Sequence, residues 1–280
     1  MPAVVSSDGT RLAYRAVGEG PPLLCLPGGP MQDAAYLGDL GGLSAHRRLV
    51  LLDPRGTGAS GVPADAASYR CDRLVGDVER VRDHLGLEQV DLLAHSAGAN
   101  LAALYAEQHP GRVRRLVLVT PSVLAVGVDV PDGARKQVAQ ERRGEPWFPA
   151  ASSALEELMA GRGGPGSAEA ITPFMYGRWD DAARAHHAAQ HGRRNEEAAA
   201  AYRAPGAFEP DRTRAVLERL PARVLVLAGE VDLNSPPSAM AEVAAVYGAA
   251  ELVVQPGAGH SPWIDDPARF VAAVAGFLDT

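Results

Sequence analysis

The segment VDLLAHSAGANLAALYAEQHP, residues 90–110, joins an apolar run to a helical pattern through a short polar corner that contains Ser96. The residues directly after the serine, AGA, have almost no side chain. A strand that turns abruptly into a helix projects one side chain above its sheet, and the cramped backbone needs small residues two positions before and two after it. Ala94 and Gly98 satisfy that need. The segment therefore predicts a strand, a tight turn at Ser96 and a helix.

The pentapeptide AHSAG is a variant of G-x-S-x-G, the pattern that exposes a nucleophilic serine at such a turn. Ala94 replaces the first glycine, which is a small departure because the requirement is steric. A serine also commonly caps the N-terminus of a helix, and this is the alternative interpretation of Ser96. A serine hydroxyl is a poor nucleophile at neutral pH, so a nucleophilic role requires a base and an acid elsewhere in the chain.

Two later strand ends supply that acid and base in the expected chain order. The stretch VLVLAGEVDLNSP places Asp232 in a polar loop after a strand, and LVVQPGAGHSPW places His260 among glycines after the last strand. We predict that Ser96 attacks, that His260 carries the proton, and that Asp232 orients the imidazole ring and stabilises its charged form.

Two other residues compete for these roles. His95 is the neighbour of Ser96 in the chain, so we expect its side chain to diverge from the hydroxyl. Glu230 lies closer to its strand than Asp232 does, and we interpret it as the end of that strand.

An acyl-transfer site also needs hydrogen-bond donors for the oxyanion that develops during attack. One candidate is the N–H of Ala97, just after the serine and at a helix N-terminus. The other should come from LPGGP, the turn after an early strand, where we choose Gly29 first and Gly28 second. The alternative for this glycine pair is an ordinary tight turn.

The stretch HHAAQH suggests a possible metal site, because His187 and His191 are spaced to share one helical face. Ala188 stands where the helix of a zinc peptidase carries its glutamate. We therefore interpret these histidines as a solvated helix face and predict no metal ligands.

The order of elements predicts a doubly wound, mostly parallel sheet. Apolar runs without alternation suit strands buried on both faces, and one alternating run suits an edge strand near the start. Helical patterns separate the strands, with stops at Gly86 and before Pro110 and an N-cap at Asp266. The apolar runs are 21–29, 47–54, 89–95, 113–121, 222–232 and 250–260, the alternating run is 10–18, and the helical patterns begin near 74, 98 and 267.

Residues 122–210, called the insertion below, contain no strand pattern and favour helices, with a glycine-rich loop at 161–166. We predict that they form a helical cap above the carboxyl edge of the sheet, where such folds bind ligands. The sheet core then comprises residues 1–121 and 211–280.

Composition excludes several classes of protein. The chain has 280 residues, is 46% hydrophobic and carries a net charge of −7, which argues against nucleic acid or an anionic membrane as the main partner. Cys25 and Cys71 are too few for a disulfide framework. No signal peptide or membrane span is evident, and Lys136 is the sole lysine among many arginines. We expect a cytoplasmic, bacterial protein, and the sequence does not predict its oligomeric state.

These residues resemble the α/β-hydrolase family over residues 1–121 and 211–280. The stretches LCLPGGP and LLDPRGTGAS further resemble the front half of proline iminopeptidases. Three features depart from that narrower pattern: Pro27 replaces a histidine, Met31 replaces a glycine, and no tryptophan follows Ser96 closely. We interpret DPRGTGAS as a structural loop that braces the rim of the site.

The resemblance implies a serine hydrolase that cleaves an ester or amide bond of a small molecule through an acyl-enzyme, without a metal or organic cofactor. Open alternatives are a carboxylesterase without amine recognition, a cofactor-free haloperoxidase-like enzyme, a carbon–carbon bond hydrolase and a non-catalytic binding module. An epoxide hydrolase or dehalogenase is disfavoured, because it would normally carry aspartate at the position of Ser96.

Proline iminopeptidases recognise a free amine with acidic residues, so the resemblance also implies a role for an acid of the insertion. Glu145 is our candidate, because RGEPWFP places it beside Trp147 and Phe148 in a segment suited to lining a pocket. We also assign Trp147 and Trp263 to the substrate pocket. The other acids of the insertion include Glu141, Glu156, Glu157, Glu169, Asp180, Asp181, Glu196 and Glu197.

Overall fold

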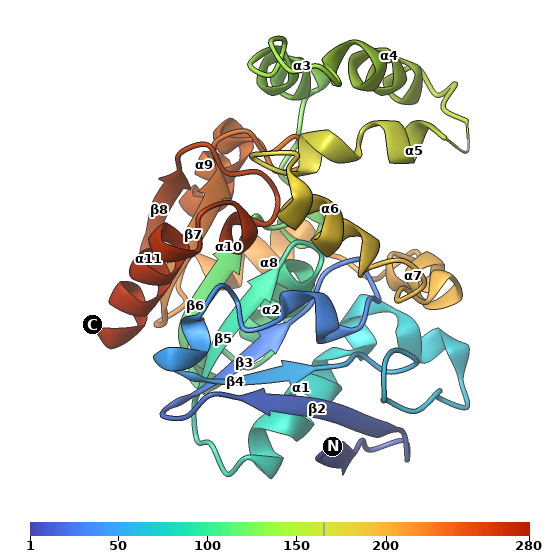
Figure 1. Cartoon of the computed structure of the whole chain (residues 1–280). Helices are drawn as coiled ribbons and strands as arrows, with labels where there is room; N and C mark the ends of the chain where they lie inside the picture. The colour runs from blue at the N-terminus through green and yellow to red at the C-terminus, as the bar shows by residue number, and fades with distance from the viewer. Residues whose placement is uncertain (165) are drawn as a thin grey trace.

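The computed structural model describes residues 1–164 and 166–280, and an eight-stranded sheet runs through that part of the chain (Figure 1). The strand order is β1-β2-β4-β3-β5-β6-β7-β8. Strands β3 to β8 pair in parallel, whereas β1–β2 and β2–β4 pair antiparallel. This confirms the predicted doubly wound, mostly parallel sheet. The strands are β1 Ala3–Val5, β2 Arg11–Val17, β3 Pro22–Leu26, β4 Arg48–Leu52, β5 Val90–His95, β6 Val113–Val119, β7 Arg223–Gly229 and β8 Ala250–Gln255.

Helices cover both faces of the sheet, because alternate residues of each buried strand point to opposite sides. Leu24 and Leu92 pack with α1, α2 and α9, whereas Leu23 and Leu93 pack with α11 and with the 3₁₀ turns η1 and η2. The core is therefore two apolar layers that share one sheet. The elements outside the insertion are η1 Ala34–Leu37, η2 Leu43–Ala45, η3 Ala66–Tyr69, η4 Cys71–Arg73, α1 Val75–His84, α2 Gly98–Gln108, η5 Pro110–Arg112, α9 Pro237–Ala245, α10 Pro262–Asp265 and α11 Pro267–Asp279.

The two edges of the sheet differ from the prediction. Strand β2 is not an edge strand, because the three-residue β1 pairs outside it, with Val4 opposite Leu12. So short a strand leaves no periodic signal in the sequence. Strand β8 is the opposite edge and is not buried on both faces, since Leu252 and Val254 are each 38% exposed. The apolar sequence of β8 resembles that of a buried strand, although β8 lies at the edge of the sheet.

The insertion is helical, as predicted, and Figure 1 shows α3, α4 and α5 together at one end of the molecule, with α6 between them and the sheet. Within its described residues no strand forms, apart from a single bridge between Gln32 and Arg194. The predicted loop 161–166 includes Pro165, which lies outside the described residues. Whether 121 and 211 are domain boundaries stays a prediction. The elements here are η6 Leu124–Val126, α3 Asp132–Gln140, α4 Phe148–Met159, α5 Ser167–Ala170, η7 Thr172–Met175, α6 Asp181–Ala188 and α7 Glu196–Tyr202. Helix α8, Pro210–Leu217, begins at the last residue of the insertion and continues into the second core segment.

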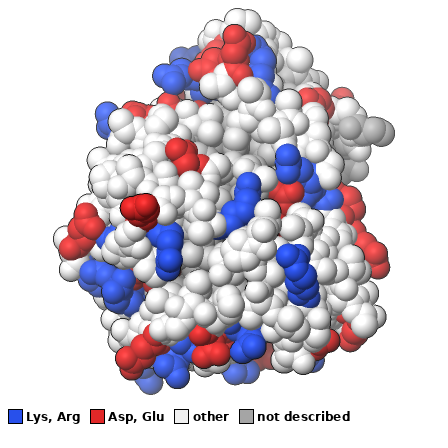
Figure 2. Space-filling model, turned by 60° about the horizontal axis from the view of Figure 1, so that its bottom comes forward, with Lys and Arg blue, Asp and Glu red and all other residues white. Residues whose placement is uncertain are grey.

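The surface carries charges of both signs. Figure 2 shows one face, on which acidic and basic side chains are interspersed among uncharged residues. Among the helices of the described chain, none is both long and apolar enough to cross a membrane. Cys25 and Cys71 are both buried free thiols, as the sequence predicted.

The close approach of α2 to the end of β3 generates a first prediction. A Cβ on Gly98 would lie 2.6 Å from the carbonyl oxygens of both Leu26 and Pro27. Because these are backbone atoms, Gly98→Ala must push the helix and the turn apart, and we expect a loss of about 1–3 kcal/mol of unfolding free energy. Urea denaturation of the purified variant measures the loss.

The matched control is Gly76→Ala, in the exposed face of α1, where an added Cβ meets nothing within 4 Å. We expect this change to stabilise the protein by about 0.5–1 kcal/mol, since alanine favours a helix. Equal stability of the two variants would contradict the proposed crowding at Gly98.

Candidate active site

Ser96 occupies the corner between β5 and α2 in a backbone conformation that is unusual for a serine. Its φ is +51°, in the left-handed region that non-glycine residues rarely adopt. Hydrogen bonds hold it there: its N–H donates to the Val119 carbonyl at 3.0 Å, and its carbonyl accepts the N–H groups of Ala99 and Ser122, each at 3.0 Å. The neighbouring strand β6 and the first turn of α2 therefore fix this strained residue.

The structure brings Ser96, His260 and Asp232 into one hydrogen-bonded chain. His260 Nε2 lies 2.9 Å from Ser96 Oγ, and His260 Nδ1 lies 2.7 Å from Asp232 Oδ2. Because a carboxylate only accepts, Nδ1 carries the proton and Nε2 presents a lone pair to the serine hydroxyl. This is the arrangement in which a histidine can remove a proton from a serine.

Asp232 and His260 come from loops after β7 and β8, and both loops are tightly held. Asp232 is fully buried, and its Oδ1 accepts the Asn234 N–H at 2.9 Å. The N–H of His260 donates to the carbonyl of Met175, in the insertion, at 2.8 Å. Asp265 holds the same loop through the Gly259 N–H at 2.8 Å. The histidine is thus positioned by both the sheet and the insertion.

Two backbone N–H groups of the pocket lining have no protein acceptor in the described chain. In the described chain, the N–H groups of Gly29 and Ala97 donate to no protein atom, and both residues line the same pocket as Ser96. Gly28, our second choice, is a different case, because its N–H donates to the Tyr36 hydroxyl at 2.7 Å. The geometry therefore favours Gly29 and Ala97 as the donor pair.

His95 points away from Ser96. Its Nε2–H donates to the carbonyl of His260 at 2.9 Å, and its Nδ1 accepts the Tyr36 hydroxyl at 2.7 Å. Burial, with a smaller contribution from the nearby His260 ring, lowers the pKa of His95 well below its ordinary value. Both ring nitrogens of His95 are occupied, so it supports the His260 backbone and offers no base to Ser96.

Glu230 is also engaged elsewhere. Its Oε2 accepts the N–H of Gly257 at 2.7 Å, in the exposed turn after β8. This contact caps that turn, while Asp232 holds the imidazole.

A pocket of about 430 Å³ opens above Ser96. Its floor is Ser96 with Gly29 and Ala97, and part of its wall is the insertion, through α7 and its flanks. The charged lining residues are Arg194, Glu196 and Arg203. Arg194 and Glu196 pair at 3.2 Å, so the positive charge of Arg203 remains in excess.

None of the three residues that we assigned to the substrate pocket lines the pocket above Ser96, and their role in binding stays a prediction. Glu145 pairs with Arg142 at 3.3 Å between α3 and α4. Trp147 packs edge-on against Phe174, in a small apolar cluster that the insertion shares with Leu233. Trp263 is 1% exposed and packs against His95 behind the catalytic group. The positions of these three side chains depend on tertiary packing, which the local sequence does not reveal.

Comparison with known proteins identifies the family. A family model described as alpha/beta hydrolase fold matches residues 21–149. A 2-hydroxymuconate semialdehyde hydrolase from Pseudomonas sp. (strain CF600) is 30% identical over 248 residues, covering 84% of this chain and 78% of the relative. The chain belongs to the α/β-hydrolase family.

Other similar proteins differ in what they are named for. A proline iminopeptidase from Heyndrickxia coagulans is 35% identical over 124 residues, covering 43% of this chain and 43% of that relative, so this match spans less than half of its length. A solved thermophilic esterase from Thermogutta terrifontis has a TM-score of 0.73 and 25% identity, and covers 99% of this chain and 97% of its own. These relatives share the α/β-hydrolase fold and are named for different reactions.

The stretch DPRGTGAS braces the rim of the site in this α/β hydrolase. The two carboxylate oxygens of Asp53 accept the N–H groups of Ala34 and Ala59, each at 3.0 Å. Arg55 is buried and pairs with Asp77 at 2.5 Å and with Asp8 at 2.6 Å. These contacts fit the structural role that we predicted for the loop.

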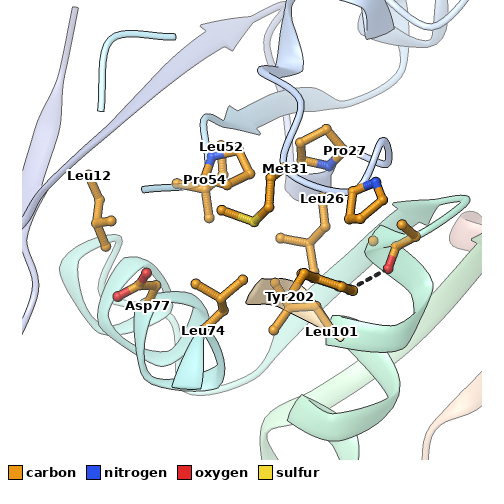
Figure 3. A pocket seen from close by; sticks show the side chains of 13 residues that line it. Leu12, Leu26, Pro27, Met31, Leu52, Pro54, Leu74, Asp77, Leu101 and Tyr202 are labelled. Carbon is orange, nitrogen blue, oxygen red and sulfur yellow. Dashed lines mark hydrogen bonds between the residues drawn. The ribbon is translucent and has the colours of Figure 1, made fainter. Parts of the chain in front are cut away.

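A second, small apolar cavity lies behind the Gly29 turn (Figure 3). Its free space is about 20 Å³, roughly enough for one water molecule. Pro30, Ala97 and Tyr202 line both this cavity and the pocket above Ser96. The Tyr202 hydroxyl donates to the Ala97 carbonyl at 2.7 Å, which links α7 to the residue after Ser96.

Sequence reasoning missed two residues that build the site. Tyr36 relays hydrogen bonds between Gly28 and His95, and nothing in its surroundings in the sequence indicated that role. Asp265 accepts a hydrogen bond that anchors the His260 loop. The sequence IDDP predicts a helix N-cap, and Asp266 forms that cap, so no separate role for Asp265 was evident from the sequence. Burial raises the pKa of the Asp265 carboxyl above its ordinary value.

The low pKa of His95 predicts a dependence of stability on pH. Below about pH 6.5 the unfolded chain binds a proton at this position that the folded chain does not, so unfolding becomes easier as the pH falls. One such group changes the unfolding free energy by at most about 1.4 kcal/mol per pH unit. His95→Gln should flatten the decline between about pH 6.5 and 5, although His186, whose pKa burial also lowers, keeps part of it. Urea midpoints across this range measure the slope, and an unchanged slope in the variant would show that His95 is protonated in the folded state.

Proposed function

We propose that this α/β hydrolase is a serine hydrolase that cleaves an ester bond of a small molecule through an acyl-enzyme. The observation that carries the proposal is the continuous chain Ser96–His260–Asp232, with contacts of 2.9 and 2.7 Å, beside two N–H groups that lack a protein acceptor in the described chain. Such a site can activate a hydroxyl and stabilise an oxyanion at the same point.

In the first half of the reaction, Ser96 Oγ attacks the substrate carbonyl while its proton passes to His260 Nε2. Asp232 accepts the Nδ1–H and stabilises the imidazolium that results. The N–H groups of Gly29 and Ala97 donate to the developing oxyanion. Collapse of the tetrahedral intermediate breaks the bond to the leaving alcohol, which takes the proton from His260, and leaves the acyl group on Ser96.

In the second half, water replaces the alcohol. His260 Nε2 accepts a proton from the water as its oxygen attacks the acyl carbon, and then returns the proton to Ser96 Oγ as the ester bond breaks. The products are the carboxylic acid and the free enzyme. The pocket of about 430 Å³ is of the size that holds a small molecule.

The nucleophile is tested by covalent labelling. A fluorophosphonate probe reacts with a serine whose hydroxyl is activated by a neighbouring base, so we expect one label per chain, on Ser96. Ser96→Ala should remove the label. Intact-protein and peptide mass spectrometry give the stoichiometry and the position.

The matched control is Ser122→Ala. Ser122 lines the same pocket, but its Oγ accepts from Asn100 at 3.0 Å and contacts no histidine in the described chain. We expect this variant to keep its label on Ser96. Label that persists in Ser96→Ala would overturn the assignment of the nucleophile.

The charges of the pocket favour an ester over a substrate that presents an ammonium group. The acid that lines the pocket, Glu196, is already paired with Arg194, and Arg203 adds a positive charge. An ammonium in this pocket would face a like charge, which disfavours its binding. The esterase with which the chain aligns over 99% of its length supports the same choice.

Carbon–carbon bond hydrolysis is the second candidate. It is supported by the 2-hydroxymuconate semialdehyde hydrolase, which covers 84% of this chain at 30% identity. The arrangement of Ser96, His260 and Asp232 is compatible with either reaction, so the two reactions are distinguished by comparing substrates.

Substrate comparison tests the preference. We expect a short p-nitrophenyl ester to be hydrolysed with a kcat/KM at least ~10-fold above that of prolyl or alanyl arylamides, because the excess positive charge of Arg203 disfavours their ammonium group. 2-Hydroxymuconate semialdehyde is the third substrate to be compared. Spectrophotometric rates with each substrate, and with the N-acetylated arylamides, measure this. An arylamide that outpaces the ester and loses its rate on acetylation would identify an aminopeptidase, and fast turnover of the semialdehyde would identify a carbon–carbon bond hydrolase.

A further inference from the structure

In place of the solvated helix face expected from the sequence, we propose that Glu169, His187 and His191 form a binding site for one divalent transition-metal ion of the Zn²⁺ class in the insertion. Glu169 lies in α5, His187 lies in the last turn of α6, and His191 lies in the turn that follows. One nitrogen or oxygen atom from each residue lies within 4.8 Å of the other two. None of the three lines the pocket above Ser96, so this site is separate from the proposed hydrolytic centre.

The spacing of His187 to each of the other two ligand atoms fits a tetrahedral ion. His187 Nε2 lies 3.2 Å from His191 Nε2 and 3.3 Å from Glu169 Oε2. Ligand atoms bound to zinc at about 2.0–2.1 Å in tetrahedral geometry lie about 3.3 Å from one another. Two of the three separations therefore already match those that an ion would impose, and the third, between Glu169 and His191, is at most 4.8 Å.

The number of protons available in the cluster also supports a bound cation. His187 Nε2 carries at most one proton, and that proton can serve either Glu169 or His191. If His191 donates to His187 instead, the Glu169 carboxylate faces a nitrogen that has no proton to give. Protons alone leave one of the two contacts unsatisfied in either tautomer. A cation shared by the three lone pairs satisfies both contacts together.

The surroundings make the site accessible and leave it one open position. The side chains of His187 and Glu169 are 23% and 67% exposed, so an ion enters directly from solvent. Three protein ligands leave a fourth position for water. Because Ala188 provides no general base beside His187, we assign the ion a structural role and no peptidase chemistry.

An ion bound at this site would link α5 to α6. The residue before His187 ties α6 to the sheet core: His186 Nε2–H donates to the Tyr36 carbonyl at 3.0 Å, and its Nδ1 accepts the Tyr176 hydroxyl at 2.9 Å. An ion that joins Glu169 to His187 and His191 therefore connects α5 to a helix that already contacts the core. Binding of the ion to the folded chain should raise its melting temperature.

Isothermal titration of ZnCl₂ into the metal-free full chain, without an affinity tag, tests the site. We expect one ion per chain in the wild type. Because each variant removes a ligand, His191→Ala and Glu169→Gln should each weaken binding at least ~10-fold. His46→Ala removes an exposed histidine from another part of the surface and serves as the matched control, with wild-type affinity expected.

Thermal unfolding provides the second readout. Zinc should raise the melting temperature of the wild type and of His46→Ala, and should raise it less in His191→Ala and Glu169→Gln. Circular dichroism of each variant without metal establishes that it is folded. The proposal is overturned if the wild type binds no zinc at millimolar concentration, or if the two ligand variants bind it as tightly as the wild type does.

Discussion

The backbone contact between Gly98 and the end of β3 is the constraint on which the site depends. The turn at Ser96 can adopt its left-handed φ of +51° only if α2 begins directly against the Leu26 and Pro27 carbonyls, at a distance that excludes a Cβ on Gly98. Strand β3 must therefore lie beside β5, as it does in the sheet. That adjacency also places the Gly29 turn next to Ala97, so one packing requirement brings together Ser96, the proposed nucleophile, and both candidate donors.

The backbone N–H and carbonyl of His260 are fixed by hydrogen bonds to three other parts of the chain. Its carbonyl accepts the Thr120 hydroxyl and the His95 Nε2–H, each at 2.9 Å, and its N–H donates to Met175. A histidine that transfers protons gains from a fixed backbone, because a small displacement of its ring lengthens the contact with the serine. The buried, neutral His95 provides part of that support without competing for the proton.

The sequence predicted features that arise locally and missed those that arise from tertiary packing. The turn at Ser96 and the loop positions of Asp232 and His260 follow from small-residue patterns and strand ends, and the structure brings these residues together. Glu145 and Trp147 illustrate the opposite case. A polar residue beside aromatic residues suggests a pocket, yet the aromatic ring packs into a separate small core with Phe174, and the acid pairs with Arg142. Helix patterns do not determine which face of an insertion meets the sheet.

The insertion is physically coupled to the reacting groups and does not merely cover them. Tyr202, at the end of α7, donates to the carbonyl of Ala97, the residue whose N–H faces the pocket. Arg203 follows it directly, so the excess positive charge of the pocket and the position of a candidate oxyanion donor depend on the same helix. On the other side, His186 of α6 contacts Tyr36, which in turn accepts the N–H of Gly28 beside the second donor. A change in the packing of either helix must therefore alter substrate recognition and the geometry of the donors together.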